Sequence, residues 1–273
     1  MTILQAILLG IIQGITEFLP ISSSAHLVLV PFLLNWKLAE KEAFVFDVLV
    51  QMGTLIAVII YFRKDLVAII KAFVQGIIKR EPFKDYDSRS GWLIILATIP
   101  AGLIGMLFKD KIEASFGNVV MVAIMLLITA GLMFAAERLG KKTRSGESLS
   151  WLDTLVMGLF QAAAVFPGIS RSGATISGGL LRQLERKTAA RFSFLMSIPI
   201  MAAAGLLSVF DLLELPNLSS FLPVMSVGFI TAEVVGYLAI AWLMKFLTKK
   251  PLWYFSIYCV VIAVVTLIVN YVR

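Results

Sequence analysis

The stretch FLPISSS at residues 18–24 interrupts an apolar segment that runs from residue 3 to residue 34. A second stretch, FPGISRSG at 166–173, interrupts the apolar segment 151–181 in the same way. Proline and glycine break helices, and serine favours turns and helix N-termini. Each segment is therefore expected to form two short helices separated by a break, rather than one helix that crosses a membrane.

The rest of the chain is too apolar for a soluble protein. Of its 273 residues 59% are hydrophobic and 15% charged, and the single cysteine excludes a disulfide framework. No signal peptide is expected, since no basic region precedes the first apolar stretch. Six stretches reach the length of about 20 residues that crosses a bilayer core; they are 44–62, 91–108, 117–137, 192–213, 222–244 and 252–272. The composition predicts an all-α polytopic membrane protein.

The positive charges predict which face of the membrane each connection occupies. Eighteen of the 24 Lys and Arg residues lie in the connections 63–90, 138–150, 182–191 and 245–250. Positive connections stay cytoplasmic, which also accounts for the net charge of +7 without a nucleic-acid partner. With those sides fixed, both interrupted segments must return to the face they enter from, so they are predicted to be re-entrant hairpins. Irregular backbone at that depth must be enclosed by protein or line a wet cavity, so the hairpins are expected to meet.

Two further patterns complete the predicted architecture. Apolar residues at helical spacing predict an amphipathic interfacial helix within 63–90. The two hairpins match each other at an offset of 148 residues, in the pairs Gly10 and Gly158, Gln13 and Gln161, Phe18 and Phe166, Ile21 and Ile169, Ser22 and Ser170, and Ser24 and Ser172. With opposite entry sides, this predicts an inverted-topology repeat of six transmembrane helices plus two re-entrant helical hairpins, with the site where the halves meet. The chain 1–273 is then a single membrane domain, with repeat one at about 1–137 and repeat two at about 151–273.

Polar groups with chemical potential gather at the two breaks. A charge at bilayer depth costs about 3 kcal/mol even on a lenient scale, so Glu17, Arg171 and the only histidine, His26, are expected to be functional. A helix that restarts near the serines would aim free N–H groups at an anion. The second break combines glycines, hydroxyls and a guanidinium, which suits a phosphate. The alternative is that Arg171 only neutralises Glu17. Asp47 and Gln51, near the outer end of the span 44–62, are expected to support the first hairpin, with a merely solvated Asp47 as the alternative.

The motifs QGITEFLPISSSAH at 13–26 and PGISRSGAT at 167–175 closely resemble the paired signatures of the bacterial undecaprenyl-diphosphate phosphatase family, the bacitracin-resistance type. The resemblance continues in FDVLVQMGTLIAVIIYFR at 46–63, ATIPAGLIG at 97–105 and AARFSFLMSIP at 189–199, and so covers essentially the whole chain. It implies a multi-pass protein of the bacterial plasma membrane whose active site opens to the extracytoplasmic side. The implied partners are a polyprenyl diphosphate lipid substrate and membrane lipid, and a homodimer is left open.

The resemblance also implies roles for individual residues. The catalytic positions are Glu17, Ser23, His26 and Arg171. The substrate-binding positions are Gln13, Ser22, Gly168, Ser170, Ser172, Gly173 and Thr175. A divalent cation, Mg²⁺ or Ca²⁺, is the implied cofactor, with Glu17 and Gln13 as its ligands.

The mechanism expected from these groups has Ser23 attack the terminal phosphorus while His26 takes the proton. Attack by His26 itself, or by water with His26 as base, is left open. The rival function is a secondary transporter or lipid-carrier flippase that uses the same central anion site, because broken helices and inverted repeats are typical of transporters.

Overall fold

The computed structural model describes residues 1–36, 40–108, 111–112, 115, 117–213 and 218–272, and within these residues it contains helices and no β-strand. The helices are α1 (Ile3–Phe18), α2 (Ser23–Leu33), α3 (Glu40–Tyr61), α4 (Arg63–Ile78), α5 (Tyr86–Leu107), α7 (Val119–Leu139), α8 (Trp151–Ala163), α9 (Arg171–Leu181), α10 (Arg186–Leu213), α11 (Leu218–Phe246) and α12 (Trp253–Val272), with a short 3₁₀ helix at Gly146–Ser148. The chain is an all-α polytopic membrane protein, as predicted.

The six predicted spans correspond to α3, α5, α7, α10, α11 and α12. Among the described residues, five helices are long and apolar enough to cross a membrane, and α3 with α4 gives a sixth if that bent pair is one span. Four helices, α3, α5, α10 and α11, begin four to six residues earlier than predicted. Asp85 caps α5 by accepting a hydrogen bond from the Ser88 N–H, and the basic residues of 186–191, predicted to lie in a linker, form the first turns of α10.

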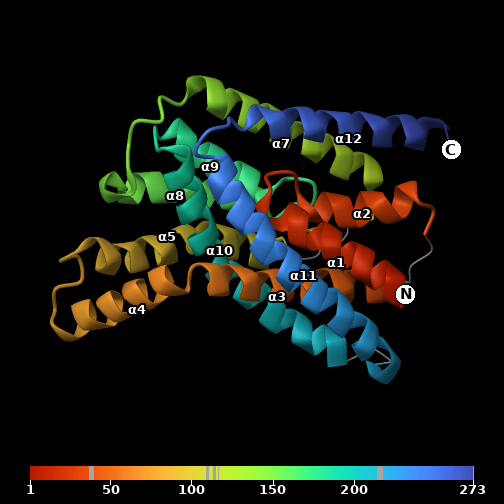
Figure 1. The fold of residues 1–273 in the computed structure, drawn as a ribbon, viewed down its shortest axis with the longest axis horizontal. Coiled ribbons are helices and arrows are strands. Elements are labelled where there is room, and N and C mark those ends of the chain that lie inside the picture. Colours follow the sequence, from red (N-terminus) through yellow and green to blue (C-terminus); the bar gives the residue numbers. More distant parts are fainter. Residues whose placement is uncertain (37–39, 109–110, 113–114, 116, 214–217, 273) are drawn as a thin grey trace.

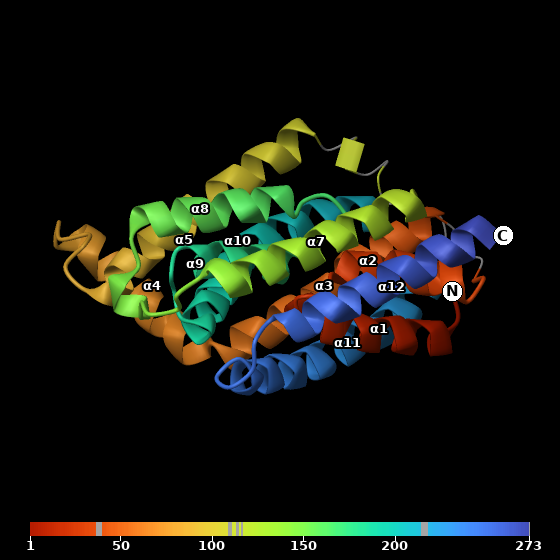
Figure 2. The ribbon, with the colours of Figure 1, turned by 90° about the horizontal axis from the view of Figure 1, so that it is seen from above.

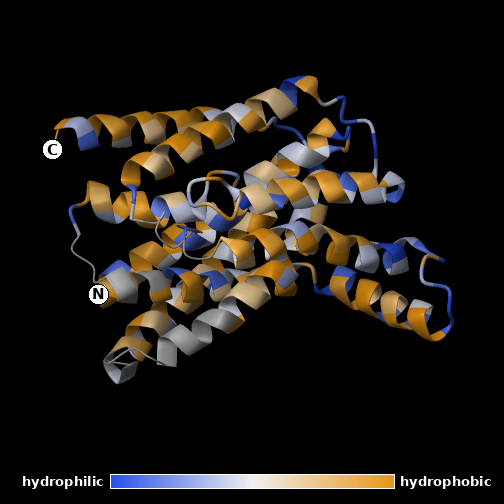
Figure 3. Ribbon diagram, turned by 180° about the vertical axis from the view of Figure 1, so that it is seen from behind, coloured by the Kyte–Doolittle hydropathy of each residue, from blue (hydrophilic) through white to orange (hydrophobic). Residues whose placement is uncertain are grey.

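Helix α4 is the amphipathic helix that the apolar spacing predicted within 63–90. It bends by 77° from the end of α3, and one side buries Ile69 and Gly76. The opposite side exposes Val67, Ile70 and Ile78. A helix with an exposed apolar face and basic residues suits the boundary between headgroups and acyl chains. Figure 3 shows hydrophobic residues over most of the helical surface and hydrophilic residues concentrated in the connections.

The basic connections share one end of the molecule. Figures 1 and 2 show both termini at one end and the α4–α5, α7–α8 and α11–α12 connections at the other. Ion pairs tie this basic end together: Arg144 and Arg182 both bind Asp153 at 2.7 Å, and Arg186 binds Glu137. The grouping of charges that underlies the predicted orientation is thus present in the fold.

The two re-entrant segments are paired helices that begin with equivalent caps. A capping box of Thr2 and Gln5 starts α1, and one of Ser150 and Asp153, 148 residues later, starts α8. After the breaks, Ser22 caps α2 and its equivalent Ser170 caps α9, and each serine oxygen accepts a backbone N–H in the following turn. The sequence offset is therefore reproduced as an equivalence of local structure.

Each hairpin packs against a helix from the other half of the chain. A Cβ added at Gly10 in α1 would lie 2.6 Å from the carbonyl oxygen of Gly228 in α11. A Cβ at the equivalent Gly158 in α8 would lie 2.8 Å from the carbonyl oxygen of Ala97 in α5. Both glycines allow close helix contact, as small residues do in membrane bundles. The halves interlock, which brings the two breaks together in the centre of the bundle (Figure 1).

Candidate active site

The two breaks contact each other directly. The N–H of Gly168 in the second break donates to Ser24 Oγ at 3.3 Å. Ser172, the equivalent of Ser24, donates its hydroxyl to the carbonyl of Leu19 in the first break at 3.2 Å. The expected meeting of the hairpins is therefore confirmed, and it is made by equivalent side chains.

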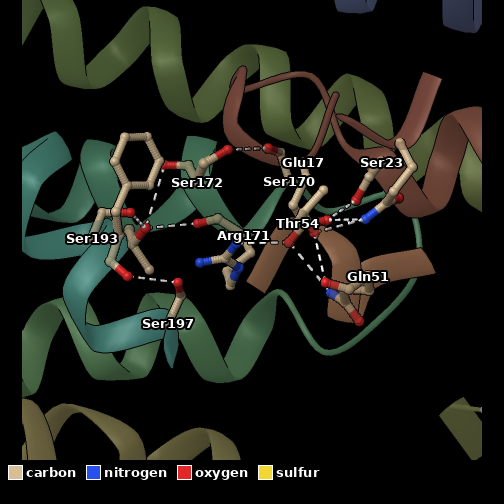
Figure 4. Close-up of polar contacts among 12 residues, drawn as sticks. Glu17, Ser23, Gln51, Thr54, Ser170, Arg171, Ser172, Ser193 and Ser197 are labelled. Carbon is tan, nitrogen blue, oxygen red and sulfur yellow. Dashed lines mark hydrogen bonds and ion pairs between the residues drawn. The ribbon is translucent and has the colours of Figure 1, made fainter. Parts of the chain in front are cut away.

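Glu17 lies at the centre of the polar network in Figure 4. Its Oε1 accepts from Arg171 Nη2 at 2.7 Å and from Gln51 Nε2 at 3.3 Å. Its Oε2 accepts from Ser23 Oγ at 2.6 Å and from Gln13 Nε2 at 3.0 Å. The carboxylate side chain is only 2% exposed. A buried charge of this kind is stable because four hydrogen-bond donors, one of them a guanidinium, surround it.

Arg171 uses only part of its binding capacity within the described residues. Nη2 binds Glu17, while Nε and Nη1 are buried without a hydrogen-bond partner. Unsatisfied guanidinium nitrogens are costly unless a ligand fills them. Because planar guanidinium donors suit phosphate oxygens, the two free nitrogens form one side of an anion site.

Helix N-termini add to this positive region. Ser23 is the first residue of α2 and Arg171 the first residue of α9, so both helices begin at the junction of the breaks. The backbone N–H groups of a first turn and the helix dipole favour an anion there. Two N-termini that meet at one point make the junction an electropositive pocket inside an apolar bundle.

The turns that aim these helices have unusual backbone geometry. Ser22 has a φ of 69°, a conformation that non-glycine residues rarely adopt. Gly168 has a φ of 97°, and an added Cβ would lie 2.5 Å from the carbonyl oxygen of Val122 in α7. The N–H of Ser170 then donates to Thr129 Oγ1 at 3.0 Å. Helix α7 therefore holds the second break in place.

His26 lies apart from the Ser23–Glu17 pair. Its Nδ1 is 2.8 Å from the carbonyl oxygen of Ser22, so this nitrogen is the donor. The other nitrogen of a neutral ring, Nε2, then accepts from the Tyr258 hydroxyl at 2.9 Å. The structure pairs Ser23 with Glu17 rather than with His26, whose ring instead contacts Ser22 and Tyr258.

A cavity of about 470 Å³ opens at the junction. Six of the predicted site residues line it: Gln13, Glu17, Ser22, Ser23, Ser170 and Arg171. The other five, His26, Gly168, Ser172, Gly173 and Thr175, lie outside the lining. They support the breaks instead: Thr175, for example, bonds the carbonyl of Arg171 and the hydroxyl of Ser193.

Further polar residues at the site were weakly marked in the sequence. Asp47, Gln51 and Thr54 follow helical spacing on α3; Asp47 and Gln51 line the cavity, and Thr54 accepts from Gln13 Nε2 at 3.4 Å. The predicted support of the first hairpin by Gln51 is confirmed. Polar residues at positions i, i+4 and i+7 of an apolar span are a recognisable signal. Tyr258 on the last helix carries no such signal.

Comparison with known proteins identifies relatives along nearly the whole chain. A family profile described as "Bacitracin resistance protein BacA" matches residues 6–265. A protein of Methanosphaera stadtmanae named undecaprenyl-diphosphatase is 43% identical, and the match covers 99% of both chains. Proteins of the same name from Chloroherpeton thalassium and Mycolicibacterium smegmatis are 42% and 43% identical over 97% and 98% of this chain, and over 95% and 96% of their own length.

Proposed function

This chain belongs to the bacitracin resistance protein BacA family, and we propose that it hydrolyses undecaprenyl diphosphate to undecaprenyl phosphate and inorganic phosphate within the membrane. This reaction returns the lipid carrier of cell-wall precursors to its monophosphate form. The observation that carries the proposal is the pair of unpartnered Arg171 nitrogens beside a serine that donates to Glu17. An anion-binding cation and an oxygen nucleophile with an adjacent base are what phosphoryl transfer requires.

Substrate binding follows from the free donors of the site. Nε and Nη1 of Arg171 would bind oxygens of the diphosphate. The backbone N–H groups in the first turns of α2 and α9 would donate further hydrogen bonds, and their partial positive charge does not depend on protonation. Nη2 remains on Glu17 at 2.7 Å. The guanidinium would thus fix the distance between the phosphate and the carboxylate, which holds the reacting atoms in position.

The chemical step uses Ser23 and Glu17. Ser23 Oγ forms a bond to the terminal phosphorus while its proton passes to Glu17 Oε2, 2.6 Å away. The bond from phosphorus to the bridging oxygen breaks, and undecaprenyl phosphate leaves with the electron pair. Glu17 then gives this proton to the departing phosphate, which restores the carboxylate. Water attacks the phosphoserine and its proton passes to Glu17, while the bond between phosphorus and Ser23 Oγ breaks. Ser23 Oγ takes up the proton from Glu17, so that inorganic phosphate is released and Ser23 is restored. His26 would hold the first turn of α2 through the Ser22 carbonyl.

Gln13 and Glu17 would hold a divalent cation, and Gln13 has an amide oxygen available as a ligand. The Oε1 of Gln13 is buried without a hydrogen-bond partner among the described residues, while its Nε2 donates to Glu17. Mg²⁺ and Ca²⁺ prefer carboxylate and amide oxygens, and Mg²⁺ is usually held by one or two carboxylates plus phosphates of the substrate. The described residues contain no group of three His, Cys, Asp or Glu side chains that could hold a metal ion, which fits a cation shared with the substrate. When bound, the cation neutralises phosphate charge.

The orientation completes the proposal. The charged connections gathered at one end of the bundle (Figure 1) favour a cytoplasmic location for that end. The site would then open toward the extracytoplasmic side of the bacterial plasma membrane. Cysteines introduced next to either end and labelled from outside intact cells test this orientation.

The deciding experiment measures phosphate release from a polyprenyl diphosphate by the purified protein, with Mg²⁺ or Ca²⁺ and after chelation. We expect release that needs the cation and is lost in Ser23→Ala. Acid-quenched wild-type protein should contain phosphate on the peptide that includes Ser23. If Ser23→Ala retains turnover and His26→Ala loses it, the nucleophile is His26 and not Ser23. No release from folded wild-type protein would refute the phosphatase.

A further inference from the structure

The cavity has a second, apolar half. Its polar residues come from α1, α2, α3, α8 and α9 and from the capping serines of the two breaks, whereas α5 and α10 contribute only apolar or small side chains and the break after α8 adds Ala164, Val165 and Ile169. These apolar lining residues are Ala101, Gly102, Gly105 and Met106 of α5, Ile200, Met201, Ala203 and Ala204 of α10, and Ala164, Val165 and Ile169 of the break. The anion site therefore continues without interruption into a groove between α5 and α10.

Two glycines of this groove are not required for packing. Among the residues that the structure describes, a Cβ added at Gly102 or at Gly105 would meet no atom within 4 Å. In contrast, a Cβ at Gly14 of α1 would lie 2.7 Å from Val235. Glycine inside a helix costs about 1 kcal/mol relative to alanine. Because Gly102 and Gly105 also line the cavity, the open space beside them is available to a ligand in the cavity.

Buried polar atoms show that the cavity is built for a ligand. Gln161, at the border of the polar and apolar halves, is 2% exposed and lines the cavity. Its Nε2 donates to the Ala97 carbonyl at 3.4 Å, while its Oε1 has no partner among the described residues. The equivalent Gln13 also leaves its Oε1 unpaired. Two orphaned buried amide oxygens in the lining of one cavity are expected where a bound ligand and its water complete the hydrogen bonds.

The far side of the groove reaches the outer surface of the helix bundle. Leu103 and Met106 on α5 are 53% and 76% exposed, and Ala203 and Ala204 on α10 are exposed as well. An apolar chain that starts at the anion site can therefore leave the protein sideways, between α5 and α10, without crossing a polar surface. The cavity volume of about 470 Å³ holds the charged group and only the first part of a long chain, so the remainder must lie in the bilayer.

We propose that Gly102 and Gly105 are specificity-determining residues that seat the first isoprene units of the polyprenyl chain in the groove between α5 and α10. This inference rests on the proposed function, because it assigns the lipid half of the same substrate. The glycines leave room for the branch methyl groups of an isoprene chain, and the apolar walls make its burial favourable.

The test uses leucine at either position, with Gly131→Leu as the matched control. A Cβ at Gly131 in α7 also meets no atom within 4 Å, and this residue does not line the cavity. The probes are a polyprenyl methylenediphosphonate, which cannot be hydrolysed, and inorganic methylenediphosphonate. We expect Gly102→Leu and Gly105→Leu to raise the Kd of the lipid probe at least tenfold and to leave that of the inorganic probe within twofold. The control should change neither.

Equal lipid affinity in all three variants would overturn the inference. So would an equal weakening of both probes, because the leucines would then disturb the anion site itself. Binding to these probes does not depend on turnover. If the wild-type protein binds the lipid probe but releases no phosphate from polyprenyl diphosphate, the proposed phosphatase activity is refuted. The proposed isoprene-binding groove is then still tested by the binding of the variants.

Discussion

Replacement of Arg171 by lysine separates the two tasks of this side chain. Nη2 holds Glu17 at 2.7 Å, and Nε and Nη1 remain free for the substrate. A lysine has one nitrogen, which can keep the contact with Glu17 but cannot also offer a fork to phosphate. Two charge-assisted hydrogen bonds are lost, each worth about 1.5–3 kcal/mol. At about 1.4 kcal/mol per factor of ten, kcat/KM should fall roughly 10²- to 10⁴-fold.

The stability of this variant should change little. Removal of a partner from a buried ion pair costs about 3–5 kcal/mol, but the lysine ammonium still neutralises Glu17. We would measure phosphate release from polyprenyl diphosphate across substrate concentrations and the thermal unfolding of the same preparations. Arg171→Ala is the comparison, and it should lower both kcat/KM and the Tm. A folded Arg171→Lys protein with kcat/KM within tenfold of wild type would refute the assignment of the free nitrogens to phosphate.

Three further outcomes follow from the geometry. Gly168→Ala should destabilise the protein by about 1–3 kcal/mol, because its φ is 97° and the Cβ meets a carbonyl at 2.5 Å; a Tm equal to that of Gly131→Ala, which has open space, would contradict this. Tyr258→Phe removes a hydrogen bond of about 1 kcal/mol from His26, so kcat/KM should fall about fivefold. An unchanged kcat/KM would show that this contact does not contribute to turnover. Asp153→Asn should cost about 1.5–3 kcal/mol of stability with turnover intact, since its carboxylate serves two arginines at the basic end; lost turnover in a protein of normal Tm would count against a purely structural role.

The breaks and spans were predictable because they depend on local properties of the chain. Prolines, glycines and serines within apolar segments mark a break wherever they occur, and the distribution of positive charge sorts the connections by side. The repeat was also visible, since the offset of 148 keeps Ser22 in register with Ser170. The structure adds that this register extends to the capping boxes of α1 and α8, where different residue types perform the same task.

The partners within the site were harder to predict because they depend on side-chain direction. Ser23 and His26 are three residues apart on α2, and such spacing normally places two side chains near each other. In the structure Ser23 turns to Glu17 and His26 turns to Tyr258. Tyr258 is 232 residues from its partner, and no local pattern encodes a contact across that separation. The tertiary arrangement of α12 therefore decides which side chain His26 contacts.

The matching caps of the two hairpins have a consequence for how such a chain could arise and be rebuilt. At the offset of 148, Ser23 corresponds to Arg171 and Glu17 corresponds to Val165. A chain made of two first halves would carry two copies of the Glu17 carboxylate and no Arg171 guanidinium. A chain made of two second halves would carry two guanidinium groups and no carboxylate at these positions. Neither symmetrical chain contains the site. Each half therefore contributes a different part of the site, Glu17 and Ser23 from the first and Arg171 from the second, and neither half can be replaced by a copy of the other.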